Sequence, residues 1–505
     1  MRERYICVHG HFYQPPRQNP WTGVIERQSG ADPYHDWNER ISAEAYTPNA
    51  RAKILATAEH PEMVFDNYSR MSFNFGPTLL SWFERHDHGV YKAVIEADKQ
   101  SSKRYGGHGS ALAQAYNHMI MPLANLHDKQ TQVIWGIKDF EYRFARKPEG
   151  MWLPETAVDT ETLEALAEAG IRFTILAPHQ AADVRAIGAS DWTAVAADSL
   201  DTGRPYRVSL PSGREIAVFF YSGPVSRSVA FEGALNDGAA FARRLLALSE
   251  VATADPQLLS IAVDGETFGH HHRFGEMALA FAMQLIEGCE DARLTNYAQF
   301  LERYPPRLEV RIAEKTSWSC AHGIERWRSD CGCKVGRDLS AGQAWRKPLR
   351  EALDWLRDAL IDLHERHTAA LLKDCWRARD GYIEVVLDPS AHARGEFLKR
   401  HCRRPLDARE CDVAIASLKI QEQAMLMFTS CGWFFDDVAG IETVQVLSHA
   451  ACAIDQAKML ERTDLEVRFL GRLAAAKSGD PLYGDGAQVY AALVKPRSRV
   501  TVNAV

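Results

Sequence analysis

Short apolar segments alternate with amphipathic helical segments from Tyr5 to about Tyr304, and this alternation constrains the fold more than any other feature. Such a pattern is typical of a parallel sheet or barrel built from β–α units. It predicts seven strands, each followed by polar, Gly or Pro residues, at residues 5–11, 71–75, 113–118, 150–153, 171–177, 216–221 and 259–263. The fold class expected from the residues is therefore α/β.

The character of the chain changes after Pro305 and Pro306. Almost every later segment has helical periodicity, with long amphipathic stretches at residues 349–363 and 415–428. We expect an α/β domain over residues 1–305 and a helical domain over 306–487. Residues 488–505, where Val alternates with polar side chains near the end, predict a C-terminal strand or tail.

Composition excludes several classes of protein. The net charge of −7 comes without a long run of Lys or Arg, so we expect no nucleic-acid partner. No segment reaches the roughly 20 apolar residues of a membrane span, and the first residues lack a signal-peptide pattern. The ten cysteines are scattered, which favours reduced thiols and a cytoplasmic location.

Polar and aromatic residues gather at the carboxyl ends of three of the predicted strands. They are His9, His11 and Gln14 at the end of the first, Trp152 and Glu155 at the end of the fourth, and Asp264, Glu266 and residues 270–272, all His, at the end of the seventh. In a parallel barrel such positions line the mouth of the active site. Two facing carboxyl groups permit glycosidic-bond chemistry, and sugar rings stack well on tryptophan.

Each of these residues also has a purely structural interpretation. Glu155 suits the first turn of a helix, and Asp264 suits a helix N-cap. The imidazoles could be buried structural groups or a surface cluster, and Trp152 could be core. The coincidence at three strand ends favours one shared site over independent explanations.

The motifs at these strand ends resemble those of glycoside hydrolase family 57, in the branch with a long C-terminal helical region of the DUF3536 type. Residues 9–15, which begin His-Gly-His, and residues 72–77, Ser-Phe-Asn-Phe-Gly-Pro, are similar to its first two regions. Residues 152–155, Trp-Leu-Pro-Glu, resemble the region of the family's nucleophile. Residues 264–269 resemble the region of its acid/base, and the resemblance covers about residues 5–320.

This resemblance implies a seven-stranded (β/α) barrel, followed by a mainly α-helical domain that packs on the barrel and completes the site. It implies a retaining enzyme, amylase, 4-α-glucanotransferase or branching-like, with Glu155 as nucleophile and Asp264 as acid/base. We expect a saccharide substrate, no cofactor and no metal, and leave the oligomeric state open. The implied substrate-binding residues are His9, His11, Gln14, Asn74, His118, Trp152, His179, Glu266, His270 and Trp318.

Two other interpretations stay open. In a metal-dependent polysaccharide deacetylase, His9, His11, Asp264 and one of the residues 270–272 would coordinate a divalent ion. Alternatively, the chain would bind saccharides without turnover, because a fold does not fix a function. The first interpretation predicts sensitivity to chelation, and the second predicts binding without product.

One cysteine-rich segment lies outside the general family pattern. It contains Cys320, His322, Cys331 and Cys333, which are the ligand types of a Cys₃His zinc site. However, Cys-x-Cys is tighter than the usual Cys-x₂-Cys pairing of zinc ligands. We therefore expect a tight turn that borders the substrate groove.

Overall fold

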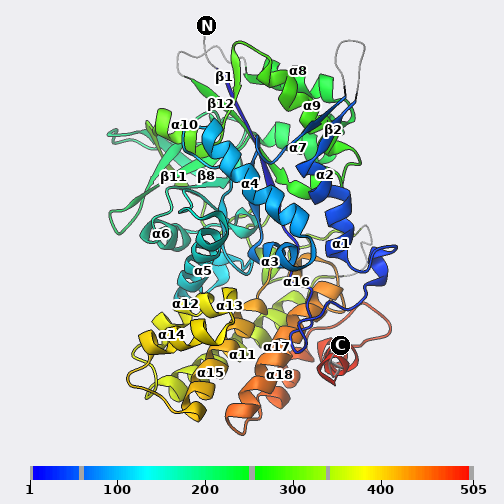
Figure 1. Cartoon of the computed structure of the whole chain (residues 1–505), viewed down its shortest axis with the longest axis vertical. Helices are drawn as coiled ribbons and strands as arrows, with labels where there is room; N and C mark the ends of the chain where they lie inside the picture. Colours follow the sequence, from blue (N-terminus) through cyan, green and yellow to red (C-terminus); the bar gives the residue numbers. More distant parts are fainter. Residues whose placement is uncertain (1–3, 56–61, 250–255, 337–341, 500–505) are drawn as a thin grey trace. The chain divides into compact units, whose positions relative to one another are not determined.

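The structure is a computed structural model that describes residues 4–55, 62–249, 256–336 and 342–499 (Figure 1). The chain forms two compact units. The first, named the α/β unit, comprises the chain up to residue 14 together with residues 27–114 and 140–318. The second, named the helical unit, comprises residues 15–26, 115–139 and the chain from 319 onward. The predicted boundary at residue 305 therefore differs from the structural division.

All seven predicted strands are present in the α/β unit. They are β1 (Arg4–Phe12), β4 (Ser72–Phe75), β5 (Ala113–Gln114), β6 (Met151–Trp152), β7 (Phe173–Leu176), β11 (Glu215–Phe220) and β12 (Gln257–Asp264). The third ends at residue 114, earlier than predicted. Parallel pairings and isolated bridges join them in the order β12-β1-β4-β5-β6-β7-β11.

Helices connect these strands, as the alternation predicts. They include α3 (Pro77–His86), α4 (His88–Arg104), α5 (Leu126–Phe144), α6 (Thr160–Glu168), α7 (Gly223–Phe231), α8 (Gly238–Ser249), α9 (Gly275–Glu287) and α10 (Tyr297–Arg303). The local sequence explains their ends. In α6, the Asp159 side chain accepts a bond from the Thr162 amide, and Gly170 follows with a φ of 84°.

A second set of strands was not predicted. It comprises β8 (Ala181–Ala186), β9 (Thr193–Ala194), β10 (Tyr206–Ser209) and β14 (Leu308–Ile312), in a sheet of order β7-β11-β10-β14-β8-β9. A short β13 (Ala292–Leu294) also pairs with β1. Because β14 bonds into this sheet after residue 305, the α/β unit extends past the predicted boundary.

Aromatic rings fill the core of the α/β unit. Phe219 of β11 contacts Phe173 of β7 and Tyr297 of α10, with ring centroids 5.7 and 4.9 Å apart respectively. Trp152 belongs to the same buried cluster. Each such ring contributes roughly 1.5–3 kcal/mol by leaving water. This core thus joins strands β6, β7 and β11 to helix α10.

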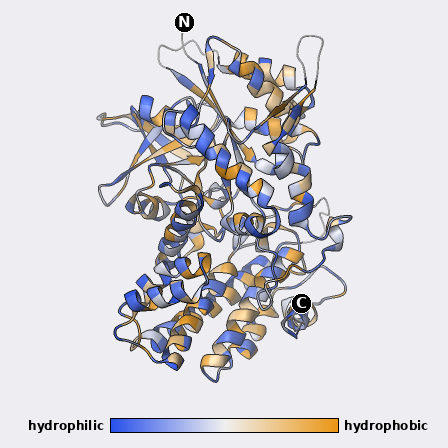
Figure 2. Ribbon diagram, in the orientation of Figure 1, coloured by the Kyte–Doolittle hydropathy of each residue, from blue (hydrophilic) through white to orange (hydrophobic). Residues whose placement is uncertain are grey.

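Long helices build the helical unit, in agreement with the sequence. They are α11 (Arg346–Thr368), α14 (Ala391–His401), α15 (Ala408–Leu426), α17 (Ile441–Leu460) and α18 (Leu465–Leu473). Helix α15 packs on α11 and α17, and α18 packs on α11. Hydrophilic and hydrophobic residues are interspersed along these helices (Figure 2). No helix among the described residues is both long and apolar enough to span a membrane.

The end of the chain is helical where the structure describes it. Asp485 is the N-cap of helix α19 (Gly486–Val489), and its side chain accepts bonds from two backbone amides. Helical turns continue from α19 to Arg499. Val489, Tyr490 and Val494 are buried at helical spacing. The predicted C-terminal strand or tail is therefore helical over residues 488–499, and residues 500–505 lie outside the described residues.

A buried ion pair joins two helical segments within the helical unit, which includes residues 126–139 of α5. Arg379 of α12 (Cys375–Gly381) lies 2.8 Å from Asp128 of α5, and both side chains are almost completely buried. Arg379 also donates to Thr131 Oγ1 and Gln421 Oε1. Removing one partner of such a pair leaves an uncompensated charge in a region of low dielectric.

Replacing Asp128 with Asn is therefore expected to lower the free energy of unfolding by about 3–5 kcal/mol. Urea unfolding followed by circular dichroism measures this change. Glu351→Gln, which breaks the exposed pair with Lys347, is the control and should have a much smaller effect. Equal losses in the free energy of unfolding for the two variants would show that the buried pair contributes no more stability than an exposed one.

Candidate active site

The carboxyl ends of neighbouring strands lie in register. His11 of β1 pairs opposite Asp264 of β12 on one side and opposite Asn74 of β4 on the other. Gln114 of β5 pairs opposite Trp152 of β6. Since all these strands are parallel, residues that are far apart in the sequence meet at one edge.

Two histidines form a buried polar network at this edge. His9 hydrogen-bonds to Ser72 Oγ through Nδ1 and to Asn74 Oδ1 through Nε2, at 3.0 and 3.1 Å. Asn74 Nδ2 donates to His11 Nδ1 and to Gln114 Oε1, at 2.9 and 2.7 Å. Burial lowers the pKa of both His9 and His11 to about 3. Both imidazoles are therefore neutral at physiological pH.

Trp152 supports both imidazoles from within the protein. Its ring stacks on His9 and His11 with centroids 4.7 and 5.1 Å apart. Trp152, His9 and Asn74 have no exposed surface. These three side chains therefore support the site from within the protein, and their contact with a substrate stays a prediction.

Glu155 follows β6 in an unusual backbone conformation. It lies in a 3₁₀ turn (Pro154–Thr156), with φ of 57° at Glu155 and 49° at Thr156. Residues other than glycine rarely adopt this left-handed conformation, which costs about 1–3 kcal/mol and is often retained at functional sites. The side chain of Glu155 is half-buried. It is not the first acid of a regular helix, which was its structural interpretation.

Trp318 binds Glu155 at two points. Its backbone N–H donates to Glu155 O, and its indole Nε1 donates to Glu155 Oε2, both at 3.0 Å. The Trp318 ring also packs edge-on against Trp152 and Tyr221. A donor that faces this oxygen suits an ionised carboxylate. Trp318 was predicted to belong to the helical domain, but it lies in the α/β unit.

Gln180 holds this turn in place, although the sequence analysis did not select it. Its Oε1 accepts from Ala177 N and Thr156 Oγ1, at 2.8 and 2.9 Å. Its Nε2 donates to Thr156 O at 2.8 Å, and Gln180 is fully buried. The sequence signal that could have identified Gln180 is a polar side chain directly after an apolar strand, and the structure places it in a 3₁₀ turn (Pro178–Gln180).

The predicted residue His179, next to Gln180, is exposed and has a different partner. Its Nε2 donates to Ser317 O at 2.9 Å. The segment that precedes Trp318 also bonds to the chain after Glu155, because Val158 N donates to Thr316 O at 3.0 Å. The chain after β14 is thus fixed beside the turn that holds Glu155.

Asp264 combines solvent access with a raised pKa. Its side chain is exposed at the end of β12, yet the protein around it removes part of its hydration, and this desolvation is the largest cause of the rise. The negative charges of Glu266 and Glu155 raise the pKa further. Asp264 makes no side-chain bond to the following 3₁₀ turn, so it does not act as an N-cap through its carboxylate.

Glu266 is buried beside Asp264. Its Oε1 accepts from Tyr13 N at 3.0 Å and from the Tyr46 hydroxyl at 2.5 Å, and Gln14 also hydrogen-bonds to this carboxyl group. Burial raises the pKa of Glu266 to about 7, although these donors oppose the rise. Glu266 thus ties the end of β12 to the chain after β1 and to Tyr46, and the predicted substrate binding by Glu266 and Gln14 stays a prediction.

Two of the predicted substrate-binding residues, His270 and His118, hydrogen-bond to residues outside the network described above. His270 hydrogen-bonds to Glu44 and packs edge-on against Trp37. His118 is buried in the helical unit, where its Nδ1 hydrogen-bonds to Ser430 Oγ at 2.7 Å.

The deacetylase interpretation requires His9, His11 and Asp264 to converge on one ion. Among the described residues, two groups of side chains have ligand atoms close enough to hold a metal, and neither contains these three residues. Both ring nitrogens of His9 are hydrogen-bonded to Ser72 and Asn74. The geometry therefore disfavours that metal site.

Comparisons with known proteins agree with the sequence resemblance. Residues 24–313, more than half of the chain, match the model of glycosyl hydrolase family 57. Residues 342–505 match the model of a domain of unknown function, DUF3536. Comparison with curated proteins gave no significant match.

Several solved structures share the fold. A maltose-forming amylase from Pyrococcus sp. ST04 is 14% identical, with a TM-score of 0.74 over 99% of this chain and 93% of that chain. A branching enzyme from Thermococcus kodakaraensis is 15% identical, with a TM-score of 0.55 over 99% and 97%. A 4-α-glucanotransferase from Thermococcus litoralis is 15% identical, with a TM-score of 0.54 over 92% and 61%. At these identities the likeness establishes the fold alone.

The raised pKa of Glu266 predicts a pH-dependent stability. A carboxyl group that binds its proton more tightly in the folded state makes the fold less stable as the pH rises from about 4.5 to about 7. Glu266→Gln should reduce this decline by up to about 1.4 kcal/mol per pH unit. Urea unfolding at several pH values measures how the free energy of unfolding depends on pH. An unchanged pH dependence in Glu266→Gln, or an equal change in the exposed control Glu168→Gln, would contradict the raised pKa of Glu266.

Gln180→Ala should destabilise the turn that contains Glu155. The substitution leaves the amide of Ala177 and the carbonyl of Thr156 without their buried partner, at a cost of about 1–3 kcal/mol for each group. The free energy of unfolding gives the measurement. The neighbouring variant His179→Ala, which loses one bond at an exposed position, should cost less. A larger loss in His179→Ala would refute the role of Gln180.

Proposed function

Because the chain belongs to glycosyl hydrolase family 57, we propose that it cleaves or transfers α-glycosidic bonds in glucans or oligosaccharides. The proposed nucleophile is Glu155 and the proposed acid/base is Asp264. The observation that carries this assignment is a solvent-accessible Asp264 whose pKa is raised partly by the charge of Glu155. The amylase, branching enzyme and glucanotransferase that share the fold support an α-glucan as substrate.

The framework of this proposal is a seven-stranded (β/α) barrel. The parallel order β12-β1-β4-β5-β6-β7-β11 supports it. A bond from Ser222 N to Ser260 O, at 2.7 Å, links the chain after β11 to β12 and would close the ring. The site then occupies the carboxyl ends of the strands, as in other barrels of parallel strands.

The first chemical step would form a glycosyl-enzyme. Glu155 attacks the anomeric carbon while the bond to the leaving oxygen breaks, and Asp264 donates its proton to that oxygen. In the second step, Asp264 accepts a proton from water or a sugar hydroxyl, whose oxygen displaces Glu155 from the sugar. Water as acceptor gives hydrolysis, and a sugar as acceptor gives transfer.

Electrostatic coupling suits Asp264 to both steps. Before the reaction, the negative charge of Glu155 helps Asp264 to retain the proton that it must donate. When Glu155 forms an ester with the sugar, that negative charge disappears. The pKa of Asp264 then falls, and its carboxylate is ready to act as a base in the second step.

Trp318 and Gln180 position the nucleophile in this scheme. The Trp318 indole orients Glu155 Oε2, and Gln180 holds the backbone of the next residue, Thr156. Neither group would exchange protons with the substrate. The alternative of a non-catalytic saccharide-binding protein requires neither a strained Glu155 nor a proton-retaining Asp264.

Glu155→Gln and Asp264→Asn should each reduce turnover of maltooligosaccharides or glycogen by about 10²–10⁴-fold or more. Products are followed by chromatography, with α-galactosides as a further substrate class and Glu168→Gln as the control variant.

Azide should restore turnover of an activated glycoside by Glu155→Ala, because it replaces the missing nucleophile. Unchanged turnover in Glu155→Gln would refute the mechanism, and saccharide binding without any wild-type product would favour the non-catalytic alternative.

A further inference from the structure

The segment that connects Trp318 to helix α11 contains a cluster unrelated to the proposed chemistry. It holds Cys320, His322, Cys331 and Cys333, all in the helical unit. The segment falls between the two regions that match family models, which end at residue 313 and begin at residue 342. The family resemblance therefore assigns it no role.

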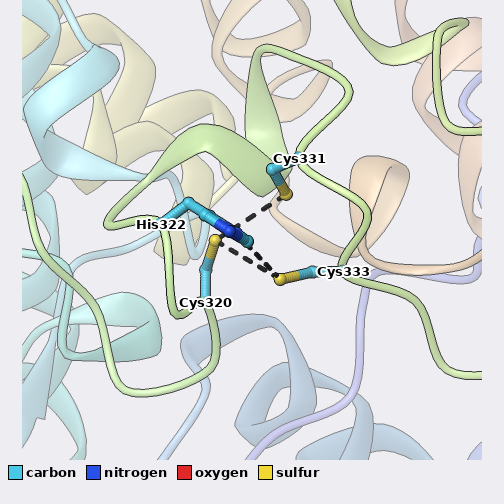
Figure 3. A group of neighbouring side chains, drawn as sticks. All are labelled: Cys320, His322, Cys331 and Cys333. Atoms are coloured by element: carbon cyan, nitrogen blue, oxygen red, sulfur yellow. Dashed lines mark hydrogen bonds between the residues drawn. The ribbon is translucent and has the colours of Figure 1, made fainter.

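The four side chains point toward one another (Figure 3). Cys320 Sγ lies 3.9 Å from Cys331 Sγ and 3.8 Å from Cys333 Sγ. Cys333 Sγ lies 3.6 Å from His322 Nδ1. One potential ligand atom from each residue lies within 4.8 Å of all the others. The cluster thus has a common centre.

These distances match those around a tetrahedral zinc ion. Zn–S bonds of about 2.3 Å at tetrahedral angles separate two sulfurs by about 3.8 Å. A Zn–N bond of about 2.0–2.1 Å separates nitrogen from sulfur by about 3.5 Å. A disulfide, by contrast, requires a sulfur separation of about 2.05 Å. The observed separations of 3.8 and 3.9 Å fit shared coordination much better than a bond between sulfurs.

The local backbone explains how a Cys-x-Cys pair reaches this geometry. Gly332, between Cys331 and Cys333, has a φ of 78°, which favours glycine. On the other side, Gly323 N donates to Cys320 O in a turn that contains His322. The expected tight turn is therefore present, and it directs the ligands inward. Sequence spacing alone had disfavoured a metal because it takes no account of this conformation.

A buried cation next to the cluster gives an independent electrostatic argument. Arg346 is fully buried, and its guanidinium donates to the neutral carbonyl oxygens of Cys333 and Phe435. The negative charge of Asp436 lies close enough to stabilise this buried guanidinium. Three thiolates, a neutral imidazole and Zn²⁺ together carry a charge of about −1, which would add to this stabilisation.

We propose that Cys320, His322, Cys331 and Cys333 bind one zinc ion. Four protein ligands leave no open position for water, so the site is structural. It would fix the fold of the segment between Trp318 and α11, because metal binding contributes directly to folding free energy. The proposal does not depend on the glycosidase mechanism, since none of the four residues belongs to the candidate active site.

Metal analysis of the full-length protein tests this proposal. Wild-type protein, purified without added chelator, should contain about one zinc per chain by mass spectrometry. Zinc-edge X-ray absorption should show three sulfur neighbours and one nitrogen neighbour. Cobalt exchanged into the site should give the thiolate charge-transfer bands of a tetrahedral complex. These measurements need no variant and so do not depend on the folding of one.

The variants Cys331→Ser and His322→Ala should lose most of the zinc, whereas Cys411→Ser, at a half-buried cysteine elsewhere in the helical unit, should retain it. His322 is exposed, so its replacement should disturb the packing little. Wild-type protein without zinc after incubation with zinc under reducing conditions would overturn the proposal. A native disulfide that includes Cys320, detected by mass spectrometry, would overturn it as well.

Discussion

The parallel hydrogen bonding of β1 to β12 and β4 is the constraint on which the candidate site depends. It brings Asp264 to one side of His11 and Asn74 to the other. A shift of one residue would turn these side chains to the opposite face of the sheet. The buried network of imidazoles and the Asn74 amide opposes such a shift, because a changed register would leave buried polar groups without partners.

The second carboxylate is held in a different way. Glu155 sits on a strained turn, and three separate segments stabilise it: the chain before it, the turn containing Gln180, and the chain after β14 that ends in Trp318. Each contact is modest alone. Together they offset a backbone conformation that costs about 1–3 kcal/mol, and strain is commonly retained where a side chain must point in one direction.

Much of this could be predicted from the sequence. Periodicity located strands β1, β4, β5, β6, β7, β11 and β12, and the motifs identified the family that the comparisons confirm. The roles of Glu155 and Asp264 stay predictions. The sequence could not distinguish residues that support the site from residues that contact a substrate, because the burial of Trp152 and His9 depends on packing from distant segments. Gln180 was missed because one of its partners, Thr156, lies 24 residues earlier in the chain, and no sequence pattern reveals that contact. The cysteine cluster was underestimated because spacing rules do not include the conformation of Gly332.

The strand β14 has a practical consequence for anyone who shortens this protein. The family match stops at residue 313, and helical periodicity predicted that the helical region begins even earlier, at residue 306. Yet the five residues beyond that match include Thr316 and Trp318, which bond to the chain around Glu155. A fragment cut at the edge of the match would keep both carboxyl groups and lose the indole that orients one of them. The smallest useful fragment therefore ends no earlier than Trp318.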